Sequence, residues 1–125
     1  MARILIIDDS PIALKVARAF LEAAGHTVDT QPTPAGLPAI VNREKPDVIL
    51  IDVSMPQHNG DQILRALRTR GSTSNFIALL FSAKPDAELT ELVRSCGADG
   101  YVSKNAGGDA LVDAVNAHLA RRGLR

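Results

Sequence analysis

Apolar residues along this chain fall into two alternating kinds of segment. Short, almost continuous apolar runs occur at residues 4–7, 48–51 and 77–81, as expected for strands buried on both faces. Residues 26–30 and 100–102 are weaker strand candidates. Between these runs, apolar residues recur at spacings of three and four, which indicates helices. The alternation predicts an α/β fold of five strand–helix repeats, with a parallel sheet covered by helices on both faces.

The predicted helices each have an apolar face. These faces consist of Ile12, Val16, Ala19 and Phe20 in the first helix, Ile63, Leu64 and Leu67 in the third, Leu89, Leu92, Val93 and Cys96 in the fourth, and Leu111, Val112, Val115 and Leu119 in the last.

Residues that favour helix ends support the same segmentation. Ser10 before Pro11 predicts an N-cap, and glycines at 25, 71 and 97 predict the ends of three helices. Prolines at 32, 34 and 38 crowd the start of the second helix, around residues 38–44, so we expect this helix to begin late or irregularly.

Composition narrows the class of protein. A length of 125 residues predicts one domain, residues 1–125. Lys+Arg and Asp+Glu both number 14, so net charge gives no reason to expect direct binding to nucleic acid or a membrane. Cys96 is the only cysteine, which excludes an intrachain disulfide and predicts a buried, inert thiol. The apolar run at residues 4–7 is too short for a signal sequence or membrane span, so a cytoplasmic protein is expected.

Charged and hydroxyl residues follow the predicted strands at matching positions. The first strand runs into Asp8 and Asp9, the third into Asp52, the fourth into Ser82 and the fifth into Lys104. The carboxyl ends of parallel strands lie along one edge of a sheet, and ligands bind there where the strand order reverses. With the order 2-1-3-4-5, the first and third strands are neighbours at that reversal, and the three aspartates would converge.

This set of residues predicts a site for a divalent cation. Three close carboxylates repel one another unless a cation compensates their charge, and oxygen ligands with retained waters suit Mg²⁺. Lys104 can hold a carboxylate or a phosphoryl oxygen, and the Ser82 hydroxyl can donate to the same oxygen. Taken alone, Asp8 or Asp9 has the alternative of a helix cap, Asp52 that of a turn residue, and Ser82 or Lys104 is more often ordinary surface chemistry. Their shared position at the ends of four strands favours a site. Three histidines, at 26, 58 and 118, lack metal-ligand spacing, and we expect them at the surface.

Four stretches of the chain resemble one known family. They are residues 4–10 (ILIIDDS), residues 46–56 (PDVILIDVSMP) with Gly60, residues 81–83 (FSA) and residues 97–104 (GADGYVSK). In this order they resemble a response-regulator receiver domain of two-component signalling, close to the single-domain chemotaxis type, over essentially the whole chain. The resemblance implies a flavodoxin-like (βα)5 three-layer sandwich with the strand order 2-1-3-4-5.

The resemblance also implies a role for each residue of the acidic site. Asp52 would be the phosphorylated aspartate, and Lys104 would pair with a phosphoryl oxygen. Asp9 would bind Mg²⁺ directly, Asp8 would act mainly through a bound water, and Ser54 would offer its backbone carbonyl to the metal.

Two further residues would form a conformational switch. Ser82 would move toward the phosphoryl group, and Tyr101 would turn inward when Ser82 moves. The chain departs from the family after Lys104, where Asn105 stands in place of the usual proline. A cis bond before a residue other than proline is costly, so we expect either a trans bond with a rearranged loop or retained strain.

The expected function is signalling rather than enzymatic turnover of a substrate. A sensor histidine kinase or a histidine phosphotransfer protein would phosphorylate the chain, which would catalyse only its own phosphorylation and dephosphorylation. A receiver acting alone would then present its fourth helix, fifth strand and fifth helix to a downstream protein or to a second copy. Two alternatives are a degenerate receiver that binds partners without phosphorylation and a small flavin carrier. Against these stand the full set of acidic and lysine positions and the absence of a glycine- and hydroxyl-rich turn after the first strand.

Overall fold

The computed structural model of the chain describes residues 2–55, 60–69 and 76–123. Strands and helices alternate along the chain as the apolar pattern predicts. The strands are β1 (Arg3–Ile7), β2 (Thr27–Gln31), β3 (Val48–Asp52), β4 (Ile77–Ser82) and β5 (Gly100–Ser103). The helices are α1 (Pro11–Ala23), α2 (Leu37–Glu44), α3 (Gly60–Thr69), α4 (Asp86–Cys96) and α5 (Gly108–Arg121), with a short 3-10 helix, η1 (Lys104–Ala106), between β5 and α5.

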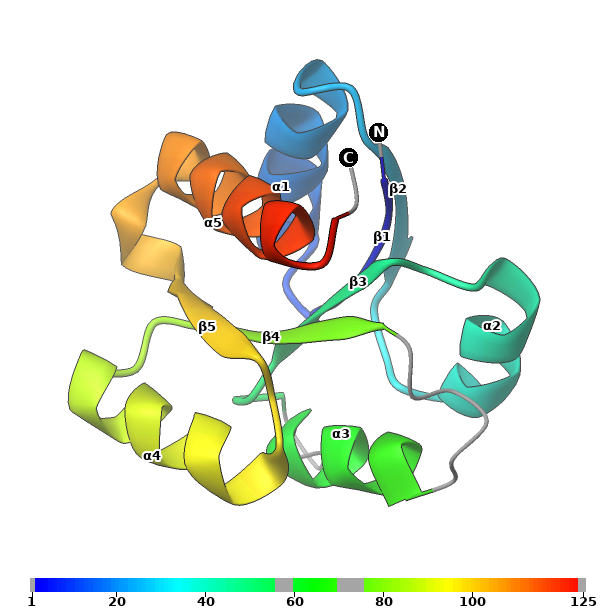
Figure 1. The fold of residues 1–125 in the computed structure, drawn as a ribbon, viewed down its shortest axis with the longest axis vertical. Helices are drawn as coiled ribbons and strands as arrows, with labels where there is room; N and C mark the ends of the chain where they lie inside the picture. The colour runs from blue at the N-terminus through cyan, green and yellow to red at the C-terminus, as the bar shows by residue number, and fades with distance from the viewer. Residues whose placement is uncertain (1, 56–59, 70–75, 124–125) are drawn as a thin grey trace.

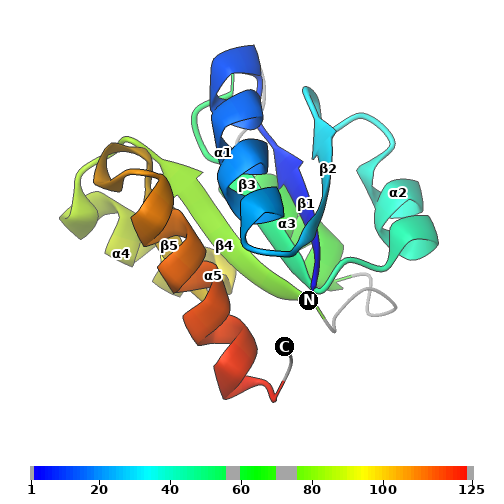
Figure 2. The ribbon, with the colours of Figure 1, turned by 90° about the horizontal axis from the view of Figure 1, so that it is seen from above.

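The five strands form one parallel sheet in the order β2-β1-β3-β4-β5. Helices α1 and α5 cover one face of the sheet, and α2, α3 and α4 cover the other (Figures 1 and 2). This is the predicted three-layer sandwich with the predicted strand order. It places β1 beside β3 at the centre of the sheet, with Ile7 level with Ile51.

The core consists of two apolar layers separated by the sheet. Successive strand side chains point to opposite faces, so Ile4, Ile6 and Leu50 lie on the α1–α5 side while Leu5 and Ile49 lie on the other side. Every residue of β3 and β4 is buried. Strands buried on both faces explain the continuous apolar runs in the sequence.

Most of the predicted helix ends are present. Ser10 is the N-cap of α1, and its hydroxyl accepts a hydrogen bond from the Ala13 N–H at 3.2 Å. Gly97 ends α4 in the left-handed conformation, with φ of 79°. Helix α1 ends slightly earlier than predicted, at Ala23, and Gly25 follows with φ of 94°. Gly71, the predicted end of α3, lies outside the described residues.

The predicted apolar face of α1 is not its buried face. Ala17 and Leu21 are buried, whereas Ile12, Val16 and Phe20 are 76%, 48% and 40% exposed. Most residues of this helix are apolar, so its sequence offers two candidate faces, and packing against β2 and α5 buries the one that contains Ala17 and Leu21. The exposed residues form an apolar stripe on the side of α1 that faces the start of α5, which we call the α1 stripe (Ile12, Val16 and Phe20).

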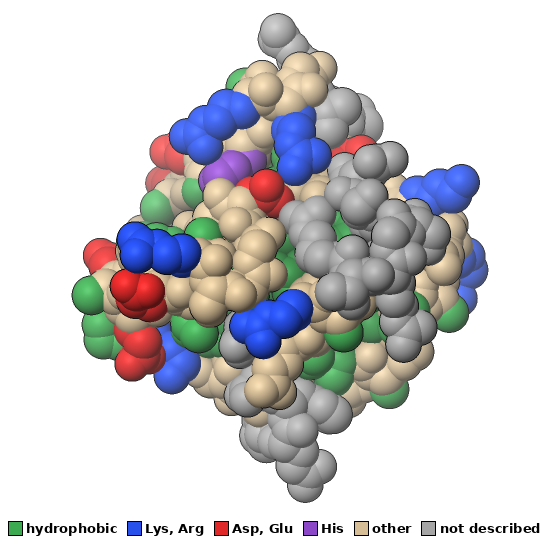
Figure 3. All heavy atoms as spheres, turned by 60° about the horizontal axis from the view of Figure 1, so that its bottom comes forward, with side chains coloured by type: hydrophobic (Ala, Val, Ile, Leu, Met, Phe, Trp, Pro, Cys, Tyr) green, Lys and Arg blue, Asp and Glu red, His purple; other side chains and the backbone are tan. Residues whose placement is uncertain are grey.

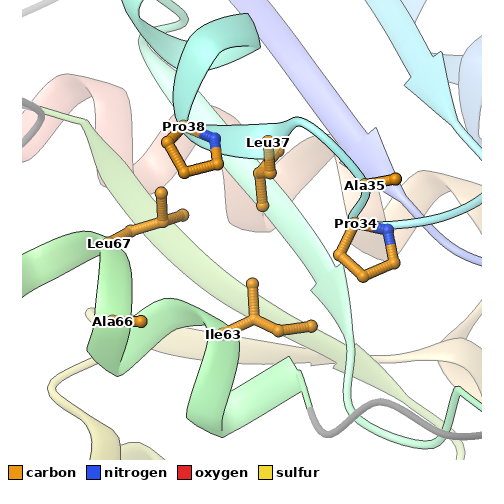
Figure 4. A pocket seen from close by; sticks show the side chains of 7 residues that line it. All are labelled: Pro34, Ala35, Leu37, Pro38, Ile63, Ala66 and Leu67. Atoms are coloured by element: carbon orange, nitrogen blue, oxygen red, sulfur yellow. The ribbon is translucent and has the colours of Figure 1, made fainter.

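Helix α2 is short and starts late, as its prolines predict. It begins at Leu37 after Gly36, whose φ of 70° is a left-handed conformation that glycine adopts readily. Pro34 and Pro38 line an apolar pocket of about 280 Å³ between α2 and α3, opposite Ile63 and Leu67 (Figure 4). The prolines therefore shape the start of α2 and its surface toward α3.

His26 is buried rather than at the surface. Its Nδ1 accepts a hydrogen bond from the Ala2 N–H at 3.1 Å, and its Nε2 lies 2.8 Å from Oδ1 of Asn116. Since Nδ1 is an acceptor, Nε2 carries the proton and donates to Asn116. The prediction of a surface role was wrong for this histidine, because one tautomer of the imidazole satisfies both the buried Ala2 N–H and the side chain of Asn116 at the surface of α5.

The described surface carries charges of both signs. On the face turned forward in Figure 3, Lys and Arg side chains alternate with Asp and Glu side chains over the described atoms. Among the described residues, no helix combines the length and the apolar character needed to cross a membrane.

Candidate functional site

The carboxylates of Asp8, Asp9 and Asp52 converge at the carboxyl ends of β1 and β3. Ile7 and Ile51 are partners in the sheet, so the residues that follow them emerge side by side. One carboxylate oxygen from each aspartate lies within 4.8 Å of the others. Asp8 and Asp52 are buried and Asp9 is exposed, so the cluster has two inner carboxylates and one at its rim.

Lys104 reaches this cluster from the end of β5. Its Nζ lies 2.6 Å from Oδ2 of Asp8 and 3.6 Å from Oδ2 of Asp52. The ammonium also lies 5.2 Å from the centre of the Phe81 ring, within the range of a cation–π contact. One cation therefore stands between two buried carboxylates that would otherwise repel each other.

A local turn recurs at the ends of the strands that build the site. A side-chain oxygen accepts a hydrogen bond from the backbone N–H two residues later, which is the geometry of Asx and Ser/Thr turns. The pairs are Asp8 with Ser10 (3.0 Å), Asp52 with Ser54 (2.9 Å), Ser82 with Lys84 (3.0 Å) and Ser103 with Asn105 (3.2 Å). These turns fix the orientation of each side chain, and they occupy Oδ1 of both aspartates while Oδ2 faces Lys104.

Burial raises the pKa of Asp52, and the neighbouring charge of Asp8 raises it further. The Ser54 N–H and the Lys104 ammonium act in the opposite direction. Burial is the largest of these effects, so the ionised carboxylate of Asp52 is held in the folded protein at a cost in free energy. An added positive charge at this position would relieve that cost.

Two aspartates at the opposite ends of the strands, Asp47 and Asp99, are not buried and have a different environment. Asp47 precedes β3, and its Oδ2 accepts a hydrogen bond from the Arg3 N–H at 2.9 Å. Asp99 precedes β5, and its Oδ2 accepts from the Ala78 N–H at 2.8 Å. These two carboxylates extend the strand pairing. The comparison separates structural aspartates at the amino ends of strands from the cluster at the carboxyl ends.

The cluster fits a small divalent cation. Oδ2 of Asp8 is fully buried and accepts no hydrogen bond of good geometry from the described residues, although Lys104 lies close to it. A buried carboxylate oxygen of this kind is costly unless a cation completes its surroundings. The donors are hard oxygens from Asp8, Asp9 and Asp52, the set that Mg²⁺ prefers.

The remaining predicted residues lie around this cluster. Ser54 is exposed, and its backbone N–H donates a hydrogen bond to Asp52. The backbone of Ser54 therefore lies beside the Asp52 carboxylate. Ser82 is buried and follows Phe81, which is the sheet partner of Asp52. The Ser82 hydroxyl accepts a hydrogen bond from the Lys84 N–H. Tyr101 is half-buried on β5 and packs against the core layer on the α3–α4 side. The structure thus places Tyr101 on the sheet face opposite to the one on which α1 and α5 lie.

The peptide bond after Lys104 is trans, since the described residues contain no cis bond. Lys104 starts the 3-10 helix η1, for which Ser103 is the N-cap. Of the two expected alternatives, the rearranged loop with a trans bond is the one observed. The loop still delivers the lysine to Asp8 and Asp52.

Gly60 is a residue of the site that the sequence analysis named only as part of a motif. A Cβ atom at this position would lie 2.2 Å from the backbone oxygen of Asp52 and 3.0 Å from the Cα of Val53. No larger residue fits unless the backbone at Gly60 or at Asp52 moves. The missed signal was the glycine at the start of α3, eight residues after Asp52, where a helix former would be expected.

Comparison with known proteins identifies the family that this geometry suggests. Residues 4–116 match the response regulator receiver domain family. The chain belongs to this family. Its members are signalling proteins of two-component systems, whose response regulators are phosphorylated by histidine kinases and generally use Mg²⁺.

One named relative is matched over almost its whole length, and others are about twice as long as the part that they share with this chain. Protein PilH of Pseudomonas aeruginosa is 36% identical over 120 residues, which cover 96% of this chain and 99% of PilH. The DNA-binding transcriptional activator EvgA of Escherichia coli is 34% identical over 114 residues, 90% of this chain but 55% of EvgA. The chain spans about half the length of EvgA and of the Mycobacterium tuberculosis regulator KdpE, of which it covers 52%.

Solved structures support the same fold. The chemotaxis protein CheY4 of Vibrio cholerae is 25% identical and superposes with a TM-score of 0.85, covering 94% of this chain and 98% of that chain. A response regulator from Chloroflexus aurantiacus, 24% identical with a TM-score of 0.87, shows the fold alone.

Proposed function

We propose that this chain is a phosphoacceptor that receives a phosphoryl group on Asp52 in a Mg²⁺-dependent reaction and changes a protein-binding surface in response. The observation that carries the proposal is the convergence of three carboxylates with Lys104, which lies 2.6 Å from Asp8 and 3.6 Å from Asp52. Membership of the receiver family supports it. The proposed domain is residues 1–125, and the proposed location is the cytoplasm.

The transfer itself requires little beyond position and charge. An oxygen of the Asp52 carboxylate would attack the phosphorus of a phosphohistidine on a sensor kinase or a phosphotransfer protein. The P–O bond to Asp52 forms as the P–N bond to the donor imidazole breaks, so the products are an acyl phosphate and a free histidine. Lys104 would balance negative charge on the transferred group as it arrives, from the position that it already occupies between Asp8 and Asp52.

Asp8, Asp9, Asp52 and the backbone carbonyl of Ser54 would hold the Mg²⁺ ion. When bound, the ion supplies charge neutralisation to the carboxylates and to the phosphoryl oxygens. Two of these carboxylates are already fixed by the hydrogen bonds to Ser10 and Ser54. The protein therefore holds its oxygen donors in place before the ion arrives, which reduces the reorganisation needed for transfer.

The switch would use Ser82 and Tyr101. The Ser82 hydroxyl now accepts a hydrogen bond from the Lys84 N–H, and its own proton is free to be donated to a phosphoryl oxygen. Movement of Ser82 would alter the space beside Tyr101, which lies on the adjacent strand β5 level with Leu80, and so the surface formed by α4, β5 and α5. That surface is the proposed contact for a downstream protein or a second copy.

The donor must approach where the site opens. Helix α1 starts at Pro11, directly after the Asp8–Ser10 turn, and the α1 stripe begins at Ile12. A pocket of about 280 Å³ joins Ile12 and Val16 of this stripe to Phe81 and Lys104. The stripe is thus continuous with the acceptor site, which supports α1 as the contact for the phosphoryl donor.

Phosphorylation by a small donor tests the proposal without the cognate kinase. The protein is incubated with acetyl phosphate, with and without MgCl₂, and its intact mass is measured. The proposal predicts the added mass of one phosphoryl group, loss of that mass on treatment with hydroxylamine, and no reaction when EDTA replaces MgCl₂. Absence of the added mass in MgCl₂ would leave a receiver that binds partners without phosphorylation as the better account.

A further inference from the structure

The loop that carries Lys104 is anchored at both ends but open along one side. Ser103 is the sheet partner of Ser82, and Gly108 at the start of α5 lies so close to the Phe20 ring that a Cβ there would be 2.3 Å from a ring carbon. Between these anchors, Lys104 and Gly107 border a pocket that also contacts Ile12 and Val16 of α1. Packing on the pocket side does not fix the position of Lys104, so the local hydrogen bonds of the loop must contribute to that position.

One such bond lies directly beside Lys104. The Ser103 hydroxyl accepts a hydrogen bond from the Asn105 N–H at 3.2 Å and forms the N-cap of η1. The residues joined by this bond are the two that flank Lys104, so the bond sets the direction in which the lysine leaves the backbone. A proline at position 105 would have no N–H to donate.

We propose that Ser103 is a positioning residue for phosphorylation, which holds Lys104 over Asp8 and Asp52 by accepting the hydrogen bond from Asn105. This inference rests on the proposed function. In this inference, the hydrogen bond to the Ser103 side chain restrains the loop, as the ring of a proline at position 105 would otherwise do. The same turn geometry at Asp8, Asp52 and Ser82 supports it, because each of the other residues at a strand end of the site is held in the same way.

The test compares rate constants for phosphorylation by acetyl phosphate in MgCl₂. Ser103→Ala is expected to slow phosphorylation about fivefold, the effect of losing a side-chain cap when the whole loss falls on the transition state. Ser103→Thr keeps the hydroxyl and is expected to restore the rate. Ser95→Ala is the matched control, because this serine is an exposed residue of α4 whose hydroxyl donates to Leu92. A wild-type rate in Ser103→Ala would overturn the proposal.

A double-variant cycle separates this bond from a general structural effect. In an Asn105→Pro background, which lacks the N–H donor, Ser103→Ala is expected to cause no further loss of rate. The same holds in a Lys104→Ala background, where no lysine remains to be positioned. An equal loss in all three backgrounds would show that Ser103 acts by another route and would overturn the proposal.

A second cycle does not require phosphorylation and distinguishes failure of this inference from failure of the proposed function. The equilibrium constant for unfolding in urea is measured for Ser103→Ala, Lys104→Ala and the double variant, without Mg²⁺. The proposal predicts a combined effect smaller than the product of the single effects, because both changes remove the same ion pair with Asp8. Independent effects would overturn it, even if the wild-type protein accepted a phosphoryl group normally. If the wild-type protein accepts none, the proposed function fails and this cycle still decides whether Ser103 positions the lysine.

Discussion

The ammonium of Lys104 lies 2.6 Å from Oδ2 of Asp8, whereas its distance to Oδ2 of Asp52, the proposed acceptor, is 3.6 Å. The lysine therefore pairs more closely with Asp8 than with Asp52. Asp8 is fully buried, and its Oδ2 has no other cationic partner in the described ion pairs. The pair leaves Asp52 partly uncompensated while keeping a positive charge within reach of a group transferred to it.

Loss of the lysine should destabilise the protein through Asp8. In Lys104→Met without Mg²⁺, a buried carboxylate is left without its cation, and we expect a loss of roughly 2 kcal/mol, below the usual value for a broken buried pair because the lysine is partly exposed. In Asp8→Asn/Lys104→Met, most of that loss should disappear because position 8 no longer carries a buried charge that needs the lysine. Urea unfolding of the three proteins measures both effects. A double variant no more stable than Lys104→Met would contradict this account of the pair.

Removal of the Asp52 charge should stabilise the protein when no Mg²⁺ is present. Burial and Asp8 raise the pKa of this carboxyl, so above that pKa the folded state holds a charge that the unfolded state carries more easily. Asp52→Asn is expected to raise the free energy of unfolding at neutral pH by about 1 kcal/mol, a shift of several degrees in the melting temperature. Asp113→Asn, at an exposed position of α5, is the matched control and should leave the melting temperature unchanged. Equal melting temperatures for Asp52→Asn and the wild type would show that the ionised Asp52 carboxylate does not destabilise the folded state.

The acceptor backbone depends on Gly60. Its missing side chain leaves room for the backbone of Asp52 and Val53, so Gly60→Ala must displace one of the two segments. We expect a loss of roughly 2 kcal/mol in the free energy of unfolding, the usual size of an overpacking effect. Gly97→Ala offers a comparison, since Gly97 has open space around its Cβ position and loses only its left-handed conformation. A smaller loss of unfolding free energy in Gly60→Ala than in Gly97→Ala would show that the close approach of Gly60 to Asp52 does not limit the residue at position 60.

His118 should make the protein less stable in mild acid. Burial lowers the pKa of this imidazole, and Arg121 and Arg122 lower it further while Asp99 opposes them. Its folded-state pKa thus lies below the unfolded value of about 6.5. The unfolded state binds the proton first as the pH falls through that value, so the free energy of unfolding falls with pH until the folded protein is protonated too. In His118→Gln, this part of the fall between neutral pH and pH 5 should be absent from urea unfolding curves, and an unchanged pH dependence would contradict the assignment.

The sequence predicted the sheet and the location of the site because both depend on simple patterns. Apolar runs mark strands buried on both faces, and polar residues that follow them must meet at one edge of a parallel sheet. The convergence of Asp8 with Asp52 follows from the strand order alone. The buried state of Cys96 was also predictable, from its place on the apolar face of α4.

Features that depend on side-chain packing were not predictable in the same way. The apolar pattern of α1 allowed two faces, and packing buries Ala17 and Leu21 while Ile12, Val16 and Phe20 stay exposed beside the start of α5. His26 is polar in isolation, but the Ala2 N–H and Asn116, far from it in sequence, make it a residue of the core. The hydrogen bond from the Asn105 N–H to the Ser103 hydroxyl, beside Lys104, is a local contact that no periodicity reports.

The most direct test of the account is the position of the phosphoryl group. Wild-type protein and Asp52→Asn are incubated with acetyl phosphate and MgCl₂, digested at low temperature, and their peptides are analysed by tandem mass spectrometry. The account predicts one phosphorylated residue, Asp52, in the wild type and no phosphorylated peptide in the variant. A phosphoryl group on another residue of the wild type, or its persistence in Asp52→Asn, would contradict the assignment of Asp52 as the acceptor.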